Sequence, residues 1–113
     1  MADTYQIIVT KAAKKDINEI LDYLQEKVSH QEAVETRRAI LSAIHKLEEM
    51  PGARSPVRES VKLGQPIKLR QIVAKKVYRI IYRIEEVVKD VVVVRVIHVK
   101  RSTGYVKKVI RDL

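Results

Sequence analysis

The stretch YRIIYRIEEVVKDVVVVRVIHVKRSTGY, Tyr78–Tyr105, decides the fold of this chain. It contains most of two runs rich in β-branched and aromatic residues, Val77–Glu85 and Val91–Arg101, with a short charged segment between them. Runs of this composition and length are typical of β-strands. Because only a few residues separate the two runs, we expect them to form neighbouring antiparallel strands.

The alternation of residues along these runs predicts two different faces for the sheet. Successive side chains of a strand point to opposite faces. In the first run Tyr78, Ile80, Tyr82 and Ile84 fall on one face, opposite Arg79, Ile81 and Arg83. The second run is apolar on both faces at first and then becomes basic toward its end. We therefore expect one face to pack on helices and the other to present cations to water or a ligand.

Two further strands and one long loop complete the expected sheet. Ile67–Ala74 alternates like a strand, and Lys75-Lys76 would form the turn that follows it. Tyr5–Val9 is a short apolar run with no tight turn to any other strand, so we expect it to pair beside a C-terminal strand. Residues 51–66 hold all three prolines and two of the three glycines, which predicts a long loop.

The N-terminal half predicts a helical hairpin. From Ala13 to Val28, apolar residues recur at the spacing of one helix face. A second helix is expected to begin at Ser29, which forms an S-x-x-E capping box with Glu32, and to end before Pro51. The short join forces antiparallel packing. The sequence thus predicts a single domain, residues 1–113, of the α+β class, with the hairpin packed on a largely antiparallel sheet of about four strands.

The composition excludes several classes of site. The chain has 113 residues and no cysteine, so disulfides, thiolate catalysis and cysteine zinc sites are absent from it. The lack of cysteine fits a reducing compartment, and no apolar run approaches the roughly 18 residues of a membrane span. We expect a cytoplasmic protein that does not bind membranes.

The positive charge lies in one part of the chain. The formal net charge is +9, and residues 66–113 carry all of it: thirteen Lys and Arg against Glu85, Glu86, Asp90 and Asp112. Such a one-sided excess predicts a polyanionic partner at the C-terminal half, with nucleic acid as the leading candidate. The alternative is a charge excess that serves solubility and has no partner.

Several motifs, in this order and spacing, resemble the RelE/ParE superfamily of toxins from bacterial type II toxin–antitoxin modules. They are A-x-x-D-I-x-x-I-x-x-Y-L at Ala13–Leu24, L-E-E-M-P at Leu47–Pro51, Y-R-I-I-Y at Tyr78–Tyr82 and V-I-H-V-K-R at Val96–Arg101. The resemblance covers nearly the whole chain. It implies a growth-inhibiting toxin and a cognate acidic antitoxin, whose disordered segment would wrap the basic surface.

The RelE branch of the superfamily cleaves mRNA in the ribosomal A site without a metal or cofactor. On that resemblance Lys68 matches a catalytic lysine, Arg79 and Arg101 match arginines that act on the phosphate, and Tyr105 matches a tyrosine that stacks on a base or assists proton transfer. Arg70, Arg83 and Lys100 would bind RNA. The chain departs from the pattern at Pro66, where a second lysine is expected.

The chemistry of such cleavage sets its own requirements. A 2′-hydroxyl nucleophile needs a base, the phosphorus needs cations, and the leaving oxygen needs an acid. Lys68 and Tyr105 can fill these roles only if neighbouring positive charge, as from Arg70 and Arg79, lowers their pKa values. His98 is another candidate base, but its parity with Val92, Val94 and Val96 favours a structural role.

The ParE branch lacks these nuclease residues and poisons DNA gyrase. The long helical hairpin of this chain resembles that branch more closely, and its target contacts would then lie in Gly104–Leu113. A small unrelated RNA-binding domain is a third possibility, although only Tyr105 is an obvious stacking residue. We narrowly favour the ribosome-dependent endoribonuclease, with ribosome and mRNA as partners, over the gyrase poison.

Overall fold

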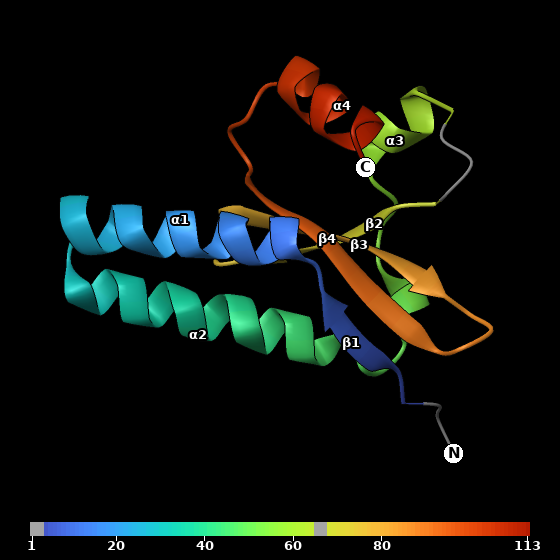
Figure 1. The fold of residues 1–113 in the computed structure, drawn as a ribbon, viewed down its shortest axis with the longest axis horizontal. Helices are drawn as coiled ribbons and strands as arrows, with labels where there is room; N and C mark the ends of the chain where they lie inside the picture. The colour runs from blue at the N-terminus through green and yellow to red at the C-terminus, as the bar shows by residue number, and fades with distance from the viewer. Residues whose placement is uncertain (1–3, 65–67) are drawn as a thin grey trace.

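A computed structural model describes residues 4–64 and 68–113 of the chain (Figure 1). Its helices and strands follow one another in the order β1 (Gln6–Val9), α1 (Lys11–Lys27), α2 (His30–Lys46), a 3₁₀ turn η1 (Pro51–Ala53), α3 (Arg58–Lys62), β2 (Arg70–Ala74), β3 (Tyr78–Glu85), β4 (Asp90–His98) and α4 (Thr103–Arg111). None of the helices in the described part of the chain combines the length and apolar composition of a membrane-spanning segment.

The four strands form one sheet in the order β1-β4-β3-β2. The pairs β2–β3 and β3–β4 are antiparallel, and β1 lies parallel to β4, with Gln6 opposite Asp90. The α+β class and the largely antiparallel sheet are therefore confirmed. So is the pairing of the first strand beside a C-terminal strand after the hairpin has crossed over.

The helical hairpin covers one face of the sheet, as the sequence predicts. Thr10 caps α1, and the Ser29 hydroxyl caps α2 by accepting a hydrogen bond of 3.0 Å from the Glu32 amide. The second half of the predicted capping box is wrong, because the Glu32 carboxylate binds the Lys75 ammonium at 2.5 Å instead. The core on this face includes Ala13, Ile17, Ile40, Ala43, Ile44, Leu47, Tyr78, Ile80, Tyr82, Val91, Val93 and Val96.

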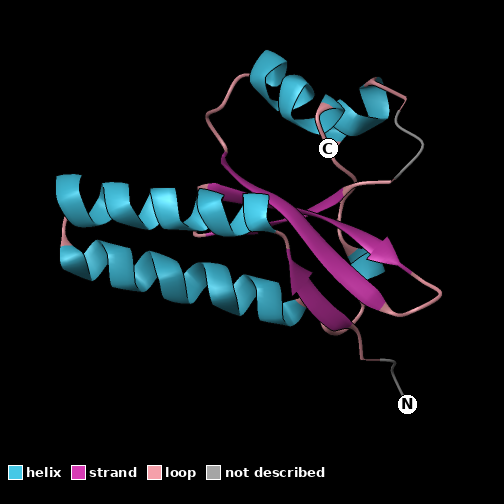
Figure 2. Cartoon of the chain, viewed as in Figure 1, coloured by secondary structure: helices cyan, strands magenta, loops and turns pink. Residues whose placement is uncertain are grey.

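The other face of the sheet is also covered, which the sequence did not predict. Helices α3 and α4 lie against it, on the side away from the hairpin (Figure 2). A second core is formed there by Val57, Leu69, Ile81, Val92, Val94, Ile97, Val106, Val109 and Ile110. The expectation that this face is open and presents cations to water is therefore wrong. Burial of apolar surface around Ile81 and the β4 valines outweighs exposure of the arginines beside them.

Three predicted boundaries also need correction. Residues 51–66 are not a plain loop, because they contain η1 and α3. The predicted strand Ile67–Ala74 begins at Arg70, although Ile67 lies outside the described residues. The predicted strand Val91–Arg101 ends at His98, and α4 follows after the Ser102 hydroxyl accepts a hydrogen bond from the Tyr105 amide at 3.1 Å.

A bulge in β4 changes which residues share a face. The register shifts between Ile81, which pairs with Arg95, and Tyr82, which pairs with Val93, so Val94 is an extra residue. Beyond a bulge the parity of the strand is reversed. His98 therefore lies on the same side as its partner Tyr78, facing the helical hairpin, and not with Val94 as simple alternation predicts.

Two ion pairs fasten helices to the sheet, one on each face. Asp16 of α1 accepts hydrogen bonds from Arg95 at 2.6 and 2.9 Å and from the Val96 amide at 2.9 Å. Glu59 of α3 accepts two from Arg79, at 2.8 and 3.2 Å. Both carboxylates are largely buried, with the Asp16 and Glu59 side chains 11% and 10% exposed. Each therefore neutralises the charge of an arginine in an apolar environment.

Replacing Asp16 with Ala should destabilise the fold strongly. The change leaves the Arg95 guanidinium without its counter-ion and the Val96 amide without its acceptor, which should lower the free energy of unfolding by about 2–3 kcal/mol. Urea unfolding followed by circular dichroism measures this loss. Glu19→Ala, at an exposed carboxylate on the same helix, is the matched control and should change stability little. Equal effects of the two changes would contradict the assigned role of Asp16.

The Glu59–Arg79 pair predicts a pH-dependent part of the stability. Hydrogen bonds from Arg79 lower the pKa of Glu59, although burial opposes this shift. A carboxylate whose pKa is depressed on folding contributes stability above its unfolded pKa, about 4.3, and that stability is lost as pH falls through the folded-state pKa. The stability difference between wild type and Glu59→Gln should therefore be full at pH 6 and shrink as the pH falls below about 4.3 and through the folded-state pKa of Glu59. A difference that does not change with pH would contradict this assignment.

Candidate functional site

The predicted nuclease residues lie toward two different ends of the sheet. Lys68 precedes Arg70, which pairs with Tyr82, whereas Arg101 follows His98, which pairs with Tyr78. The four residue-to-residue steps from Tyr78 to Tyr82 already span about 13 Å along a strand. The exposed Lys68 is thus separated from Arg101, and the sheet does not bring the two together.

Arg79 is held in a network of protein contacts. Besides its two hydrogen bonds to Glu59, its Nε donates to the Gln71 side chain at 2.9 Å. The Arg79 side chain is only 12% exposed. The guanidinium therefore has its charge balanced by a carboxylate, and a phosphate would have to compete with Glu59 to reach it. Glu59 itself gave no sequence signal, because it falls within the predicted loop.

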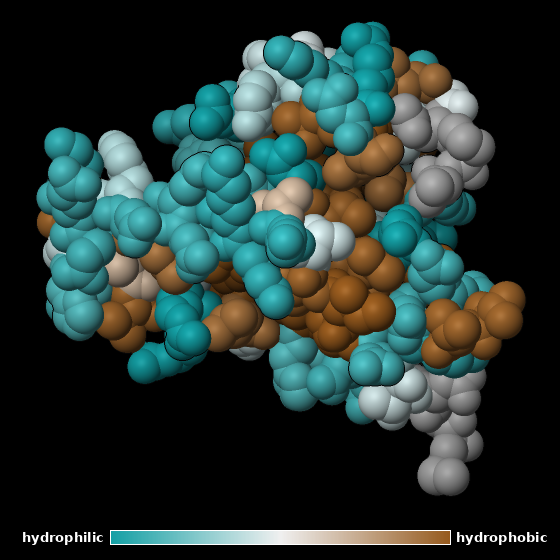
Figure 3. All heavy atoms as spheres, viewed as in Figure 1, coloured by the Kyte–Doolittle hydropathy of each residue, from teal (hydrophilic) through white to brown (hydrophobic). Residues whose placement is uncertain are grey.

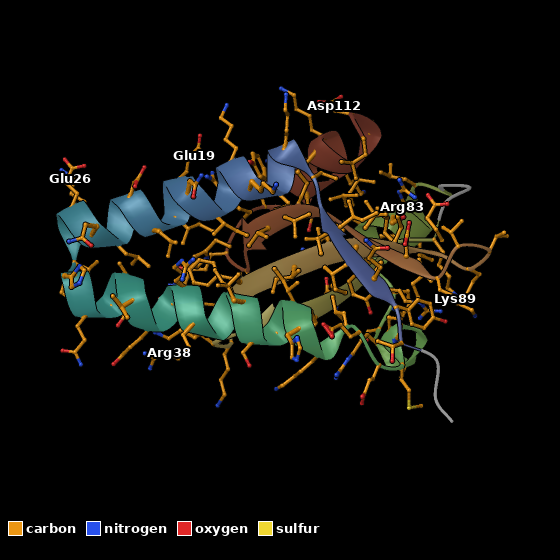
Figure 4. The ribbon with its side chains drawn as sticks, turned by 60° about the horizontal axis from the view of Figure 1, so that its bottom comes forward. Glu19, Glu26, Arg38, Arg83, Lys89 and Asp112 are labelled. Atoms are coloured by element: carbon orange, nitrogen blue, oxygen red, sulfur yellow. The ribbon has the colours of Figure 1, made fainter. Side chains whose placement is uncertain are left out.

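The three predicted RNA-binding residues have different surroundings. Arg70 donates a hydrogen bond of 2.7 Å to the carbonyl of Arg54, and Arg83 forms an ion pair with Glu85. Arg83 lies near the β3–β4 hairpin end, far from the join of the two long helices (Figure 4). Lys100 is exposed, in the turn that follows β4. These three residues do not form one continuous basic groove with Lys68.

Arg101 and Tyr105 do come together. The Arg101 guanidinium lies 4.6 Å from the centre of the Tyr105 ring, the geometry of a cation–π contact. Both residues border a cleft of about 440 Å³ between α1 and the connection from β4 to α4. Its other lining residues are Asp16, Glu19, Ile20, Tyr23, Leu24, Tyr78, Arg95, Val96, Ile97 and His98. The Arg95 charge in this cleft is already paired with Asp16.

His98 lies in this cleft, and two contacts hold its ring in place. The ring packs edge-on against Tyr78, with centres 5.6 Å apart, and Nδ1 accepts a hydrogen bond of 3.0 Å from the Lys100 amide. Burial raises the pKa of Tyr78. This environment agrees with the structural role that we expect for His98, although the bulge changes the face on which that role is played.

The remaining tyrosine of the first core has no access to a ligand. Tyr82 is fully buried and donates a hydrogen bond of 2.6 Å to the carbonyl of Pro51, and burial raises its pKa to about 12. Its predicted role in core packing is confirmed. Within residues 4–64 and 68–113 there is no cluster of three or more His, Cys, Asp or Glu side chains that could hold a metal ion.

Comparison with known proteins identifies relatives of the fold. The model of the family described as "ParE toxin of type II toxin-antitoxin system, parDE" matches residues 7–103. A chain of the chromosomal ParDE system from P. aeruginosa is similar, with a TM-score of 0.71 and 16% identity over 88% of this chain and 100% of that one. A chain of the RelBE2 toxin–antitoxin complex from Mycobacterium tuberculosis has a TM-score of 0.54 and 20% identity, over 84% and 91% of the two chains. No curated protein matches significantly.

The two kinds of likeness carry different weight. At identities of 16% and 20% the solved structures show a shared fold and nothing finer. The family match runs from β1 through the connection between β4 and α4. It covers the first core and the strand residues of the second, but not Tyr105 or the core residues Val106, Val109 and Ile110 of α4. The chain therefore belongs to the ParE toxin family of type II toxin–antitoxin systems.

Proposed function

We propose that this toxin inhibits growth by binding and poisoning DNA gyrase, and that it does not cut mRNA. The observation that carries the proposal is the state of Arg79, whose charge is balanced by Glu59 and whose Nε is taken by Gln71. Arg79 is one of the two arginines that the resemblance to RelE assigns to the phosphate. The ParE family match supports the same choice between the two branches of the superfamily.

The requirements of RNA cleavage also favour the gyrase proposal. A lysine that acts as a base needs cations beside it to lower its pKa. Of the two arginines expected to serve Lys68, Arg79 has its charge balanced by Glu59, and Arg70 keeps its charge but is oriented toward the Arg54 carbonyl. The catalytic roles of Lys68, Arg79, Arg101 and Tyr105 remain predictions. So does RNA binding by Arg70, Arg83 and Lys100.

A cognate antitoxin is part of the proposal. The structural relatives are named as members of ParDE and RelBE toxin–antitoxin systems. Residues 66–113 of this chain have thirteen Lys and Arg against four acids, which suits capture of an acidic segment by electrostatic steering. We propose that this segment covers the basic C-terminal half and so blocks contact with the target.

The surface proposed to meet gyrase is the outer side of α4 and the connection before it. Lys108 and Arg111 are exposed there, while Val106, Val109 and Ile110 face the second core. A helix fastened by its apolar side presents its polar side in a fixed orientation, which suits recognition by a protein surface. Most of α4 falls within Gly104–Leu113, the segment that the sequence indicated for the gyrase alternative, whereas the connection lies just before it.

The test compares two products of the wild-type toxin. Purified toxin is added to gyrase with supercoiled DNA, and separately to a translating extract in which mRNA 5′ ends are mapped by primer extension. We expect gyrase-dependent DNA breaks and no new mRNA ends. New ends that appear only in translated mRNA, without DNA breaks, would contradict the proposal and favour the endoribonuclease.

The variant Lys68→Arg sharpens the same experiment. It keeps the positive charge of an exposed side chain but replaces the lysine amine, which a nuclease would use as a base, with a guanidinium that cannot be deprotonated. A gyrase poison should retain its activity in this variant, within about threefold, because exposed substitutions perturb little. Loss of toxicity in Lys68→Arg, with unchanged unfolding and antitoxin affinity, would support a catalytic lysine and oppose the gyrase proposal.

A further inference from the structure

The end of the β3–β4 hairpin exposes two adjacent valines. Glu85 and Asp90 close the hairpin, and the loop between them carries Val87, which is 98% exposed, and Val88, which is 62% exposed. This hairpin end projects from the body of the molecule, at the right of Figure 1. Figure 3 shows hydrophobic atoms gathered at the same end.

The two valines have no evident role in folding. Tight hairpin loops favour Gly, Asn and Asp, whereas β-branched residues are better suited to strands. Neither Val87 nor Val88 belongs to either apolar core. Their side chains therefore remain in water in the isolated toxin, where they gain none of the free energy that apolar burial supplies.

Hydrogen bonds connect the residues on either side of the two valines to β1 and to the residue before it. The Tyr5 hydroxyl donates to Glu86 at 3.1 Å, and the Lys89 ammonium lies 3.1 Å from the same carboxylate and 5.3 Å from the centre of the Tyr5 ring. The Gln6 amide donates to the Lys89 carbonyl at 2.9 Å. An apolar tip whose flanking residues are already held loses less conformational entropy when a partner covers it, which favours binding.

The charge around the loop differs from that of the rest of the C-terminal half. Residues 83–90 contain Glu85, Glu86 and Asp90 against Arg83 and Lys89. The remainder of residues 66–113 has eleven Lys and Arg and the single acid Asp112. An acidic antitoxin is therefore attracted to the surface outside this hairpin end and repelled slightly from the end itself.

We propose that Val87 and Val88 dock into an apolar pocket of the toxin's protein target, and that they lie outside the surface that the antitoxin covers. The pocket should have a neutral or basic rim, to match the acids beside the valines. The inference rests on the proposed function in taking the target to be a protein. It adds a contact that is separate from the outer side of α4, on the hairpin that β3 and β4 form.

The test is the double variant Val87→Ser/Val88→Ser. The change removes apolar surface that is exposed in the free toxin, so the midpoint of urea unfolding should stay the same. We expect the toxin concentration for half-maximal gyrase-dependent DNA cleavage to rise at least about tenfold, because two apolar contacts are lost. Growth arrest on induction should weaken in parallel. Affinity for the cognate antitoxin should remain within about threefold of wild type.

The matched control is Val28→Ser/Val61→Ser. These two valines are also exposed, at 59% and 64%, but lie at the join of the helical hairpin and on α3. The control should retain full DNA cleavage, growth arrest and antitoxin affinity. A loss in the control equal to that in the tip variant would mean that exposed valines in general matter, and would contradict the proposal.

Three results separate this inference from the proposed function. Wild-type DNA breaks that persist unchanged in the tip variant would overturn the inference and leave the gyrase proposal standing. If the tip variant loses antitoxin affinity together with toxicity, the valines lie within the surface that the antitoxin covers, which also overturns the inference. If wild-type toxin causes no DNA breaks, the gyrase proposal fails, and the inference about the valines is then tested by growth arrest alone. Full growth arrest by the tip variant contradicts the inference whatever the target is.

Discussion

Strand β4 is apolar on both of its faces, and both faces must be kept from water. Val91, Val93 and Val96 turn toward one core, and Val92, Val94 and Ile97 turn toward the other. A strand of this kind needs a layer on each side, as buried strands of α/β sheets do. The long hairpin of α1 and α2 supplies one layer. The short helices α3 and α4 supply the second, and their position follows from the need to cover β4 and its neighbour β3.

The two-sided burial also determines the role of the arginines in the sheet. An arginine between two apolar layers needs a counter-ion, because an unpaired charge is costly there. Arg95 finds Asp16 on α1, and Arg79 finds Glu59 on α3. Each pair ties a helix to the strand that it covers. Arginines that the sequence predicts to lie on a ligand-binding face thus hold helices to the sheet. The positive charge available to partners lies on exposed residues such as Lys108 and Arg111.

Periodicity predicted the parts of the fold that depend on local pattern. The hairpin helices, the turn at Lys75-Lys76 and the core face of β3 all follow from regular spacing. Regular alternation failed at Val94, where the bulge inserts a residue and reverses the parity of His98. Helix α4 was missed because its apolar residues, Val106, Val109 and Ile110, become a recognisable stripe only when a core beneath them is known to exist.

The candidate site was harder to predict than the fold. The identities of Lys68, Arg79 and Arg101 follow from motifs, but their separation depends on strand register, which regular alternation alone does not fix and which the bulge at Val94 shifts. The ion pair of Arg79 with Glu59 could not be predicted for a different reason. Glu59 lies in a segment rich in proline and glycine whose short helix has only five residues, too few for a periodic signal.

Amide hydrogen exchange of α4 tests the two-sided burial most directly. The account predicts that the amides of Val106, Val109 and Ile110 are strongly protected, because these residues are buried against β4 and the helix opens only with much of the second core. Their protection should approach that of the β4 amides. Exchange in α4 as fast as in an unstructured peptide, with β4 still protected, would contradict the account, because this face of the sheet would then be open to water.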